Sequence, residues 1–232
     1  MRKIIVAFGA VMALLALGST GALASARSGS PDATPACGSQ CVDVSSLLLG
    51  TSTIQNAYIY GDHGTGGQVG DAVDLKYASN SRPNEDFTKG QVGTLADFCG
   101  RLIRRTSYVC VNYPHTFPVY ETGWTPFGNA SGLCVGIKLP GFRGEKVTLQ
   151  RCGASAATLW VGDLNNAVAV NGHLYSPWVN GADPNFSHPL VLTVNAGSHH
   201  PANLLLVRRL NFLTGHVVPD SQQFTLSYGP VP

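Results

Sequence analysis

Short apolar runs, separated by loops rich in glycine, proline and polar residues, recur along the chain. In the middle of the sequence the apolar run 133–137 is followed, after a loop, by residues 147–149, where apolar and polar side chains alternate. Alternation of this kind is typical of a strand with one buried face. No stretch keeps the 3.6-residue apolar spacing of an amphipathic helix over ten residues. The pattern therefore predicts an all-β protein.

The same order of two strands and a large aromatic residue occurs three times. The aromatic residues are Phe87, Trp160 and Phe224, spaced 73 and 64 residues apart. A long-period repeat in which each unit ends in one aromatic side chain predicts three lobes that share a core. The strand pairs expected before these aromatics are 57–60 with 73–77, 133–137 with 147–149, and 189–194 with 204–207.

The middle unit carries the most specific motif. It reads Cys-Val-Gly-Ile at 134–137, then Val-Thr-Leu-Gln-Arg-Cys at 147–152, then Trp160. This order resembles one lobe of the ricin-B-type β-trefoil family, whose Gln-x-Trp signature is matched by residues 221–224 and more loosely by 84–87. The resemblance covers about residues 55–229 and implies a β-trefoil. Its lobes would be about 55–99, 131–178 and 188–229, with an aromatic-rich insertion at 100–130 between the first two.

The resemblance also implies where sugars would bind. In the family each lobe offers an Asp after the first strand, an aromatic ring after the second, and an Asn and a Gln before the Trp. Most of these anchors are missing here, and the first lobe is the one that could still assemble a polar pocket. The corresponding residues are Asp62, Lys76, Asn84 and Glu85 in lobe 1; Gly136, Gln150, Ala157 and Thr158 in lobe 2; and Thr193, Val207, Ser221 and Gln222 in lobe 3.

Two further segments have a composition suited to sugar recognition. The insertion 100–130 contains Trp124 among several aromatic residues and prolines, and residues 176–188 combine Trp178 with Asn180 and Asp183. An exposed ring can stack on a sugar while short polar side chains bond its hydroxyls. Alternatively, the rings pin the insertion to the barrel wall and the second segment is an ordinary turn-rich loop. Both interpretations remain open at this point.

The N-terminus predicts export. Residues 1–26 hold two basic side chains, an apolar run and a small-residue cleavage site, as in a secretory signal peptide. We expect 27–36 to be a disordered leader and 37–229 a single domain, in which 37–54, including Asp43, is an N-terminal segment tied to the barrel. The predicted protein is secreted, monomeric and not inserted in a membrane.

The net charge restricts the classes of partner that the protein can bind, and the cysteine content predicts disulfides. Removing residues 1–26 takes away two of the 15 basic residues and none of the 13 acidic ones, which leaves 13 of each. A neutral balance argues against nucleic acid as a partner. Six cysteines in an exported chain favour disulfides. The expected pairs are Cys99 with Cys110 around a hairpin at 102–109, Cys134 with Cys152 on the family's precedent, and Cys37 with Cys41. A disulfide from Cys37 or Cys41 to Cys99 or Cys110 is the alternative that stays open.

No catalytic signature is present. The sequence lacks Gly-x-Ser-x-Gly, His-Glu-x-x-His, Cys-x-x-Cys and a phosphate-binding loop, and its seven histidines are scattered. We therefore expect no catalytic residues, no metal and no cofactor. The sequence favours a secreted, non-enzymatic protein that binds carbohydrate through divergent trefoil sites. The alternative is a protein-interaction or inhibitor scaffold that uses the 100–130 insertion, so the expected partner is a glycan or an extracellular protein.

Overall fold

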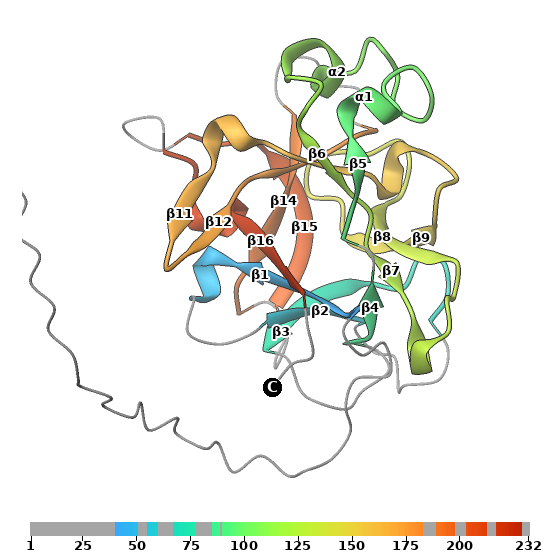
Figure 1. Cartoon of the computed structure of the whole chain (residues 1–232). Helices are drawn as coiled ribbons and strands as arrows, with labels where there is room; N and C mark the ends of the chain where they lie inside the picture. The colour runs from blue at the N-terminus through green and yellow to red at the C-terminus, as the bar shows by residue number, and fades with distance from the viewer. Residues whose placement is uncertain are drawn as a thin grey trace, which may run out of the picture. The chain divides into compact units, whose positions relative to one another are not determined.

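The computed structural model describes residues 40–50, 55–59, 67–77, 85–88, 90–182, 189–197, 203–212 and 217–228. The predicted signal peptide and leader lie outside these residues. The described part consists mostly of β-strands with a few short helices (Figure 1). None of its helices has the length and apolar character needed to cross a membrane.

Three antiparallel hairpins form the repeating unit of the fold. Their strands are β2 (Gln55–Ile59) with β3 (Val73–Tyr77), β8 (Leu133–Ile137) with β9 (Val147–Arg151), and β14 (Leu190–Asn195) with β15 (Asn203–Arg209). These are the three strand pairs that the sequence predicts, with bounds that differ by a few residues.

The second strands of the three hairpins pair with one another. Each of β3, β9 and β15, or the residue just before it, pairs with both of the others, so that the three form a closed triangle. The residues that face each other are Ala72 and Thr148, Lys146 and Leu206, and Leu204 and Asp74. Since these positions correspond in the three repeats, the pairing has an internal threefold pattern.

A second set of strand pairs links each unit to the next. The first strands of the units are β1 (Val42–Ser46), β7 (Gly123–Trp124) and β13 (Trp178–Asn180), and the last strands are β4 (Phe87–Thr88), β10 (Trp160–Gly162) and β16 (Phe224–Tyr228). The last strand of each unit pairs with the first strand of the following one, and β16 returns to β1. The residues opposed at the three junctions are Phe87 and Trp124, Trp160 and Asn180, and Phe224 and Ser46.

The N-terminal segment is therefore an integral part of this arrangement. Residues 42–46, expected only to be tied to the barrel, form β1 and pair with β16 along its whole length. All five β1 residues are buried. The units are accordingly β1–β4, β7–β10 and β13–β16, and the described part is a β-trefoil-like fold.

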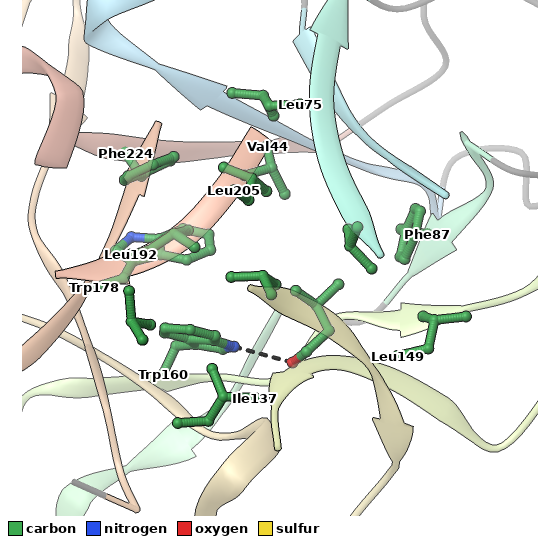
Figure 2. Close-up of a cluster of buried hydrophobic side chains, with 14 of the residues drawn as sticks. Val44, Leu75, Phe87, Ile137, Leu149, Trp160, Trp178, Leu192, Leu205 and Phe224 are labelled. Atoms are coloured by element: carbon green, nitrogen blue, oxygen red, sulfur yellow. Dashed lines mark hydrogen bonds between the residues drawn. The ribbon is translucent and has the colours of Figure 1, made fainter. Parts of the chain in front are cut away.

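The three repeated aromatic residues lie in one hydrophobic core. Phe87, Trp160 and Phe224 are each at most 1% exposed and pack among aliphatic side chains of all three units (Figure 2). The indole Nε1 of Trp160 donates a hydrogen bond to the carbonyl oxygen of Val135 at 3.0 Å. The ring is thus fixed by packing and by one buried hydrogen bond.

The insertion between the first two units has a core of its own. It contains β5 (Gln91–Thr94), α1 (Leu95–Phe98), α2 (Tyr108–Asn112) and β6 (Pro118–Tyr120), and it packs against a second hydrophobic cluster. The prediction of a hairpin at 102–109 is wrong, because residues 108–112 are helical. Ser107 caps that helix by accepting a hydrogen bond from the backbone N–H of Cys110 at 3.4 Å.

A second insertion separates β10 from β13. It holds the hairpin of β11 (Val168–Val170) and β12 (His173–Tyr175). Asn171 and Gly172 form its two-residue turn with φ of 50° and 80°, the left-handed values that such a turn requires.

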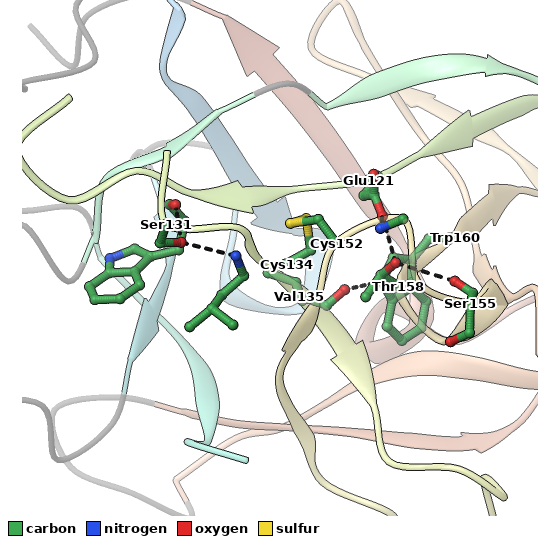
Figure 3. Close-up of a disulfide and its surroundings, with 11 residues drawn as sticks. Glu121, Ser131, Cys134, Val135, Cys152, Ser155, Thr158 and Trp160 are labelled. Carbon is green, nitrogen blue, oxygen red and sulfur yellow. Dashed lines mark hydrogen bonds between the residues drawn. A yellow bond between two sulfur atoms is a disulfide. The ribbon is translucent and has the colours of Figure 1, made fainter. Parts of the chain in front are cut away.

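Two of the expected disulfides are present. Cys99 bonds Cys110 within the first insertion, and Cys134 bonds Cys152 across the β8–β9 hairpin, as Figure 3 shows. Cys41 is also disulfide-bonded, and Cys37 lies outside the described residues. Disulfides favour an oxidising compartment.

Candidate functional site

Several of the described positions that the family resemblance assigns to sugar binding lie close to one another, and most of these described positions are buried. In the middle unit a Cβ atom on Gly136 would lie 2.8 Å from the carbonyl oxygen of Ala157 and 3.1 Å from Cγ2 of Thr158. Thr158 is fully buried and donates a hydrogen bond to Oε1 of Glu121 at 2.6 Å (Figure 3). At positions 136, 157 and 158 this lobe therefore leaves no space for a sugar.

The corresponding site of the third unit is filled by its own glutamine. The side-chain amide of Gln222 donates to Oγ1 of Thr193 at 3.3 Å and to the carbonyl oxygen of Arg209 at 3.0 Å. Its carbonyl oxygen accepts from the backbone N–H of Asn211 at 3.0 Å. Because Gln222 is buried and bonded at both ends, its role here is structural.

In the first unit the equivalent positions form an ion pair. Lys76 on β3 lies 2.5 Å from Glu85, and both side chains are buried. Asp62 and Asn84, the other two candidates of this lobe, lie outside the described residues. Glu85 is therefore not an open hydrogen-bonding group for a ligand in this structure.

The two tryptophan candidates belong to the core. Trp124 and Trp178 are each 3% exposed. A Cβ on Gly67 would lie 2.6 Å from Cζ3 of Trp124, so this ring rests directly on the Gly67 backbone. Neither indole is an exposed ring, because Trp124 on β7 and Trp178 on β13 lie in the main core of the trefoil units.

The polar neighbours of Trp178 are likewise committed. Asn180 is fully buried; its amide donates to the carbonyl oxygen of Ala157 at 3.0 Å, and its oxygen accepts from the N–H of Ala182 at 3.0 Å. Asp183 lies outside the described residues. The sequence could not reveal this outcome, because an asparagine beside a tryptophan has the same appearance in a binding loop and in a buried turn.

Trp178 nevertheless forms the floor of an open groove. The groove has a volume of about 340 Å³ and lies where the β5–β6 hairpin, the β11–β12 hairpin and β16 approach one another. Polar and apolar side chains both line it. The lining includes Gln91, Tyr120, His173, Trp178, Phe224 and Thr225.

Three aromatic rings in mutual contact lie beneath this groove. The ring of Tyr120 lies on that of Trp178, with centroids 4.9 Å apart and planes inclined by 22°. Trp178 in turn packs against Phe224, with centroids 5.8 Å apart. Tyr120 is only partly buried, so it presents a rigidly held aromatic surface to the groove.

Polar groups surround this aromatic surface. Gln91 on β5 and His173 on β12 are exposed, and Thr225 lies on β16. Amide, imidazole and hydroxyl groups can each donate and accept hydrogen bonds, as sugar hydroxyls do. A ring flanked by a few convergent polar groups is the arrangement expected of a small-ligand site.

A group of buried carboxyl groups lies elsewhere, around β1 and β4. Asp43 is 4% exposed, and its Oδ1 has no hydrogen-bond partner. Burial and, to a smaller extent, the nearby negative charge of Glu85 together raise the pKa of Asp43 to about 7. Burial also raises the pKa of Asp86 to about 6, although a hydrogen bond from the backbone of Phe127 opposes this change.

These carboxyl groups are not arranged as a metal centre. Across the residues that the structure describes, no three His, Cys, Asp or Glu side chains are placed to hold a metal ion. The consequence that follows from Asp43 and Asp86 is a stability that depends on pH.

The strand pairing thus defines an all-β, trefoil-like protein whose fold is compatible with a binding role. No known family model matches the sequence, and the comparison with curated proteins finds no match. Among solved structures the chain is similar to the designed 3-fold symmetric protein ThreeFoil, at 12% identity and a TM-score of 0.44, over 80% of this chain and 96% of that one. It is also similar to a Caenorhabditis elegans protein of unknown function, at 9% identity and a TM-score of 0.40, over 83% and 95% of the two chains. The fold assignment rests on the strand pairing described above.

Proposed function

We propose that this chain is a secreted, non-catalytic β-trefoil that binds carbohydrate in the groove floored by Tyr120 and Trp178. The three-lobed reading follows from the cyclic pairing of β4 with β7, β10 with β13, and β16 with β1. Secretion is supported by the predicted signal peptide and by the disulfides of the described part. The proposed site differs from the three family positions, which the structure fills with its own side chains.

The observation that carries the proposal is the stack of Tyr120 on Trp178 beneath polar side chains. Sugars present apolar C–H faces and polar hydroxyl edges, so a ring with hydrogen-bonding neighbours matches both. The groove volume of about 340 Å³ lies at the lower end of the range for small-ligand sites. We therefore expect the groove to hold one or two sugar units of a larger glycan.

His173→Ala is the variant that tests the site with the least damage to the fold. His173 is exposed on β12, so its removal should leave the core unchanged while deleting one hydrogen bond to the ligand. We expect the glycan affinity to fall by about five- to ten-fold, the effect of one lost hydrogen bond. A glycan array followed by titration calorimetry would measure this change.

Gln91→Ala should have a similar effect from the opposite wall of the groove. Arg104→Gln, on the insertion loop and outside this groove, is the matched control and should bind the glycan as the natural protein does. Equal affinity in all three variants would contradict the placement of the site. If no glycan on the array binds saturably, the result would instead favour an extracellular protein as the partner of the 100–130 insertion.

A further inference from the structure

A second and larger cavity lies where the first insertion meets the middle unit. It has a volume of about 620 Å³, is open to solvent, and is lined by the loop between α1 and α2, the β8–β9 loop, the start of η5 (Ala156–Thr158) and the end of β13. Much of its wall is apolar, formed by Leu102, Leu139, Pro140 and Ala156. Its size lies within the range of cavities that hold small molecules.

One positive charge faces this apolar space. Arg104 is the single charged side chain in the cavity wall, and it makes no ion pair within the described part of the chain. The neighbouring Arg101 instead donates a hydrogen bond to the carbonyl oxygen of Asp97 at 3.3 Å, and Arg105 packs over Gly100. Of the three arginines in this loop, Arg104 alone is placed to meet a ligand in the cavity.

The cavity's serine hydroxyls add hydrogen-bond donors. Ser107 accepts a hydrogen bond from the N–H of Cys110, and Ser155 accepts one from the N–H of Ala157 at 3.2 Å. Neither hydroxyl donates a hydrogen bond in the described structure, so each can turn its proton toward the cavity. Arg104 and the two serines therefore offer donors, and the matching ligand group is an acceptor.

We propose that this cavity binds a small carboxylate with an apolar body, whose carboxylate pairs with Arg104 while its chain packs against Leu102, Leu139 and Ala156. A guanidinium holds a carboxylate through two parallel hydrogen bonds, which gives both strength and orientation. The apolar walls supply the rest of the affinity by removing the ligand's chain from water. The inference concerns a different cavity from the glycan groove and stands independently of it.

The test compares decanoate with decanol on the full mature protein by titration calorimetry. Decanoate is expected to bind saturably, and decanol, which has the same chain and no charge, at least about ten-fold more weakly. Arg104→Gln should weaken decanoate binding by about ten-fold or more, because it removes the charge-assisted hydrogen bonds. Arg101→Gln and Arg105→Gln change the net charge equally and should leave the affinity almost unchanged.

A second variant tests the cavity without altering charge. Ala182→Phe places a ring in the cavity wall and should abolish decanoate binding, while circular dichroism and the melting temperature verify that the variant is folded. The proposal is overturned if decanoate does not bind saturably or if decanol binds equally well. It is also overturned if all three arginine variants lose the same affinity, since that would indicate a general charge effect.

Discussion

Replacing Trp160 with alanine is expected to lower the free energy of unfolding by about 4 kcal/mol or more. The side chain is 1% exposed at the centre of the main core, and truncation of such a residue leaves a cavity as well as losing buried apolar surface. It also leaves the buried carbonyl oxygen of Val135 without the indole donor that it has now. For a protein at the lower end of the ordinary range of stability, about 5 kcal/mol, this loss would leave a measurable fraction of the population unfolded at room temperature.

Urea denaturation followed by circular dichroism would measure this effect. Trp160→Phe is the informative partner variant, because phenylalanine already occupies the equivalent positions 87 and 224. It should cost less than alanine, with the unpaired Val135 carbonyl contributing about 1–2 kcal/mol. Phe142→Ala, which removes a ring that is 63% exposed, should change stability by less than about 0.5 kcal/mol. A Trp160→Ala protein as stable as the Phe142→Ala control would contradict the assigned core.

The second large effect is a loss of stability as pH rises, caused by Asp43. Its pKa in the folded protein is about 7, against an ordinary value of 3.8. The folded state therefore binds the proton more tightly than the unfolded state does. The stability from this group is fully present below about pH 4 and is lost as pH rises through about 7. The difference between these two pKa values corresponds to roughly 4 kcal/mol.

Asp43→Asn should remove this dependence, because asparagine cannot ionise in the buried site. The variant is expected to match the natural protein near pH 4 and to exceed its stability at pH 8 by a few kcal/mol. Denaturant unfolding at several pH values would measure both curves. Asp86, whose pKa is raised to about 6, adds a dependence of the same sign in both proteins, so the comparison between them isolates Asp43.

Asp97→Asn is a control, because the contribution of Asp97 to stability changes with pH in the opposite direction to that of Asp43. Hydrogen bonds from the backbone and side chain of Thr94 lower the pKa of Asp97, so its stabilising effect is present at neutral pH and lost as pH falls. This variant should therefore be less stable than the natural protein at pH 7 and equal to it at low pH.

If the free energy of unfolding of Asp43→Asn and of the natural protein changed with pH in the same way, Asp43 would not be buried as described.

The sequence predicts the repeating part of this fold well. Alternation within 73–77 and 147–149, and the apolar run 204–207, predict the second strands of the three hairpins, which the structure contains. The role of residues 42–46 is harder to predict, since their partner β16 lies about 180 residues away and no local pattern reports such a pairing. Likewise, the helix at 108–112 depends on the Ser107 cap and on packing against the insertion's own core.

The candidate sites are less predictable than the fold. The family positions contact one another as the resemblance implies, yet Gly136, Glu85 and Gln222 are closed off by neighbours that only the folded chain supplies. The groove, in contrast, joins Gln91, Tyr120, His173 and Thr225 from four separate strands. The sequence offers one indication of this groove, which is Tyr120 among the other aromatic residues of the insertion. Its stacking on Trp178 could not be predicted, because it requires β6 and β13 to pair with opposite edges of β10.

The most direct test of the proposed glycan groove is a map of backbone and indole chemical shifts by NMR as a binding glycan is added. We expect progressive shifts at Gln91, Tyr120, His173 and Thr225 and at the indole N–H of Trp178, with residues 102–107 unaffected. Shifts confined to residues 100–117, or the absence of any shift at the groove, would contradict the proposed site.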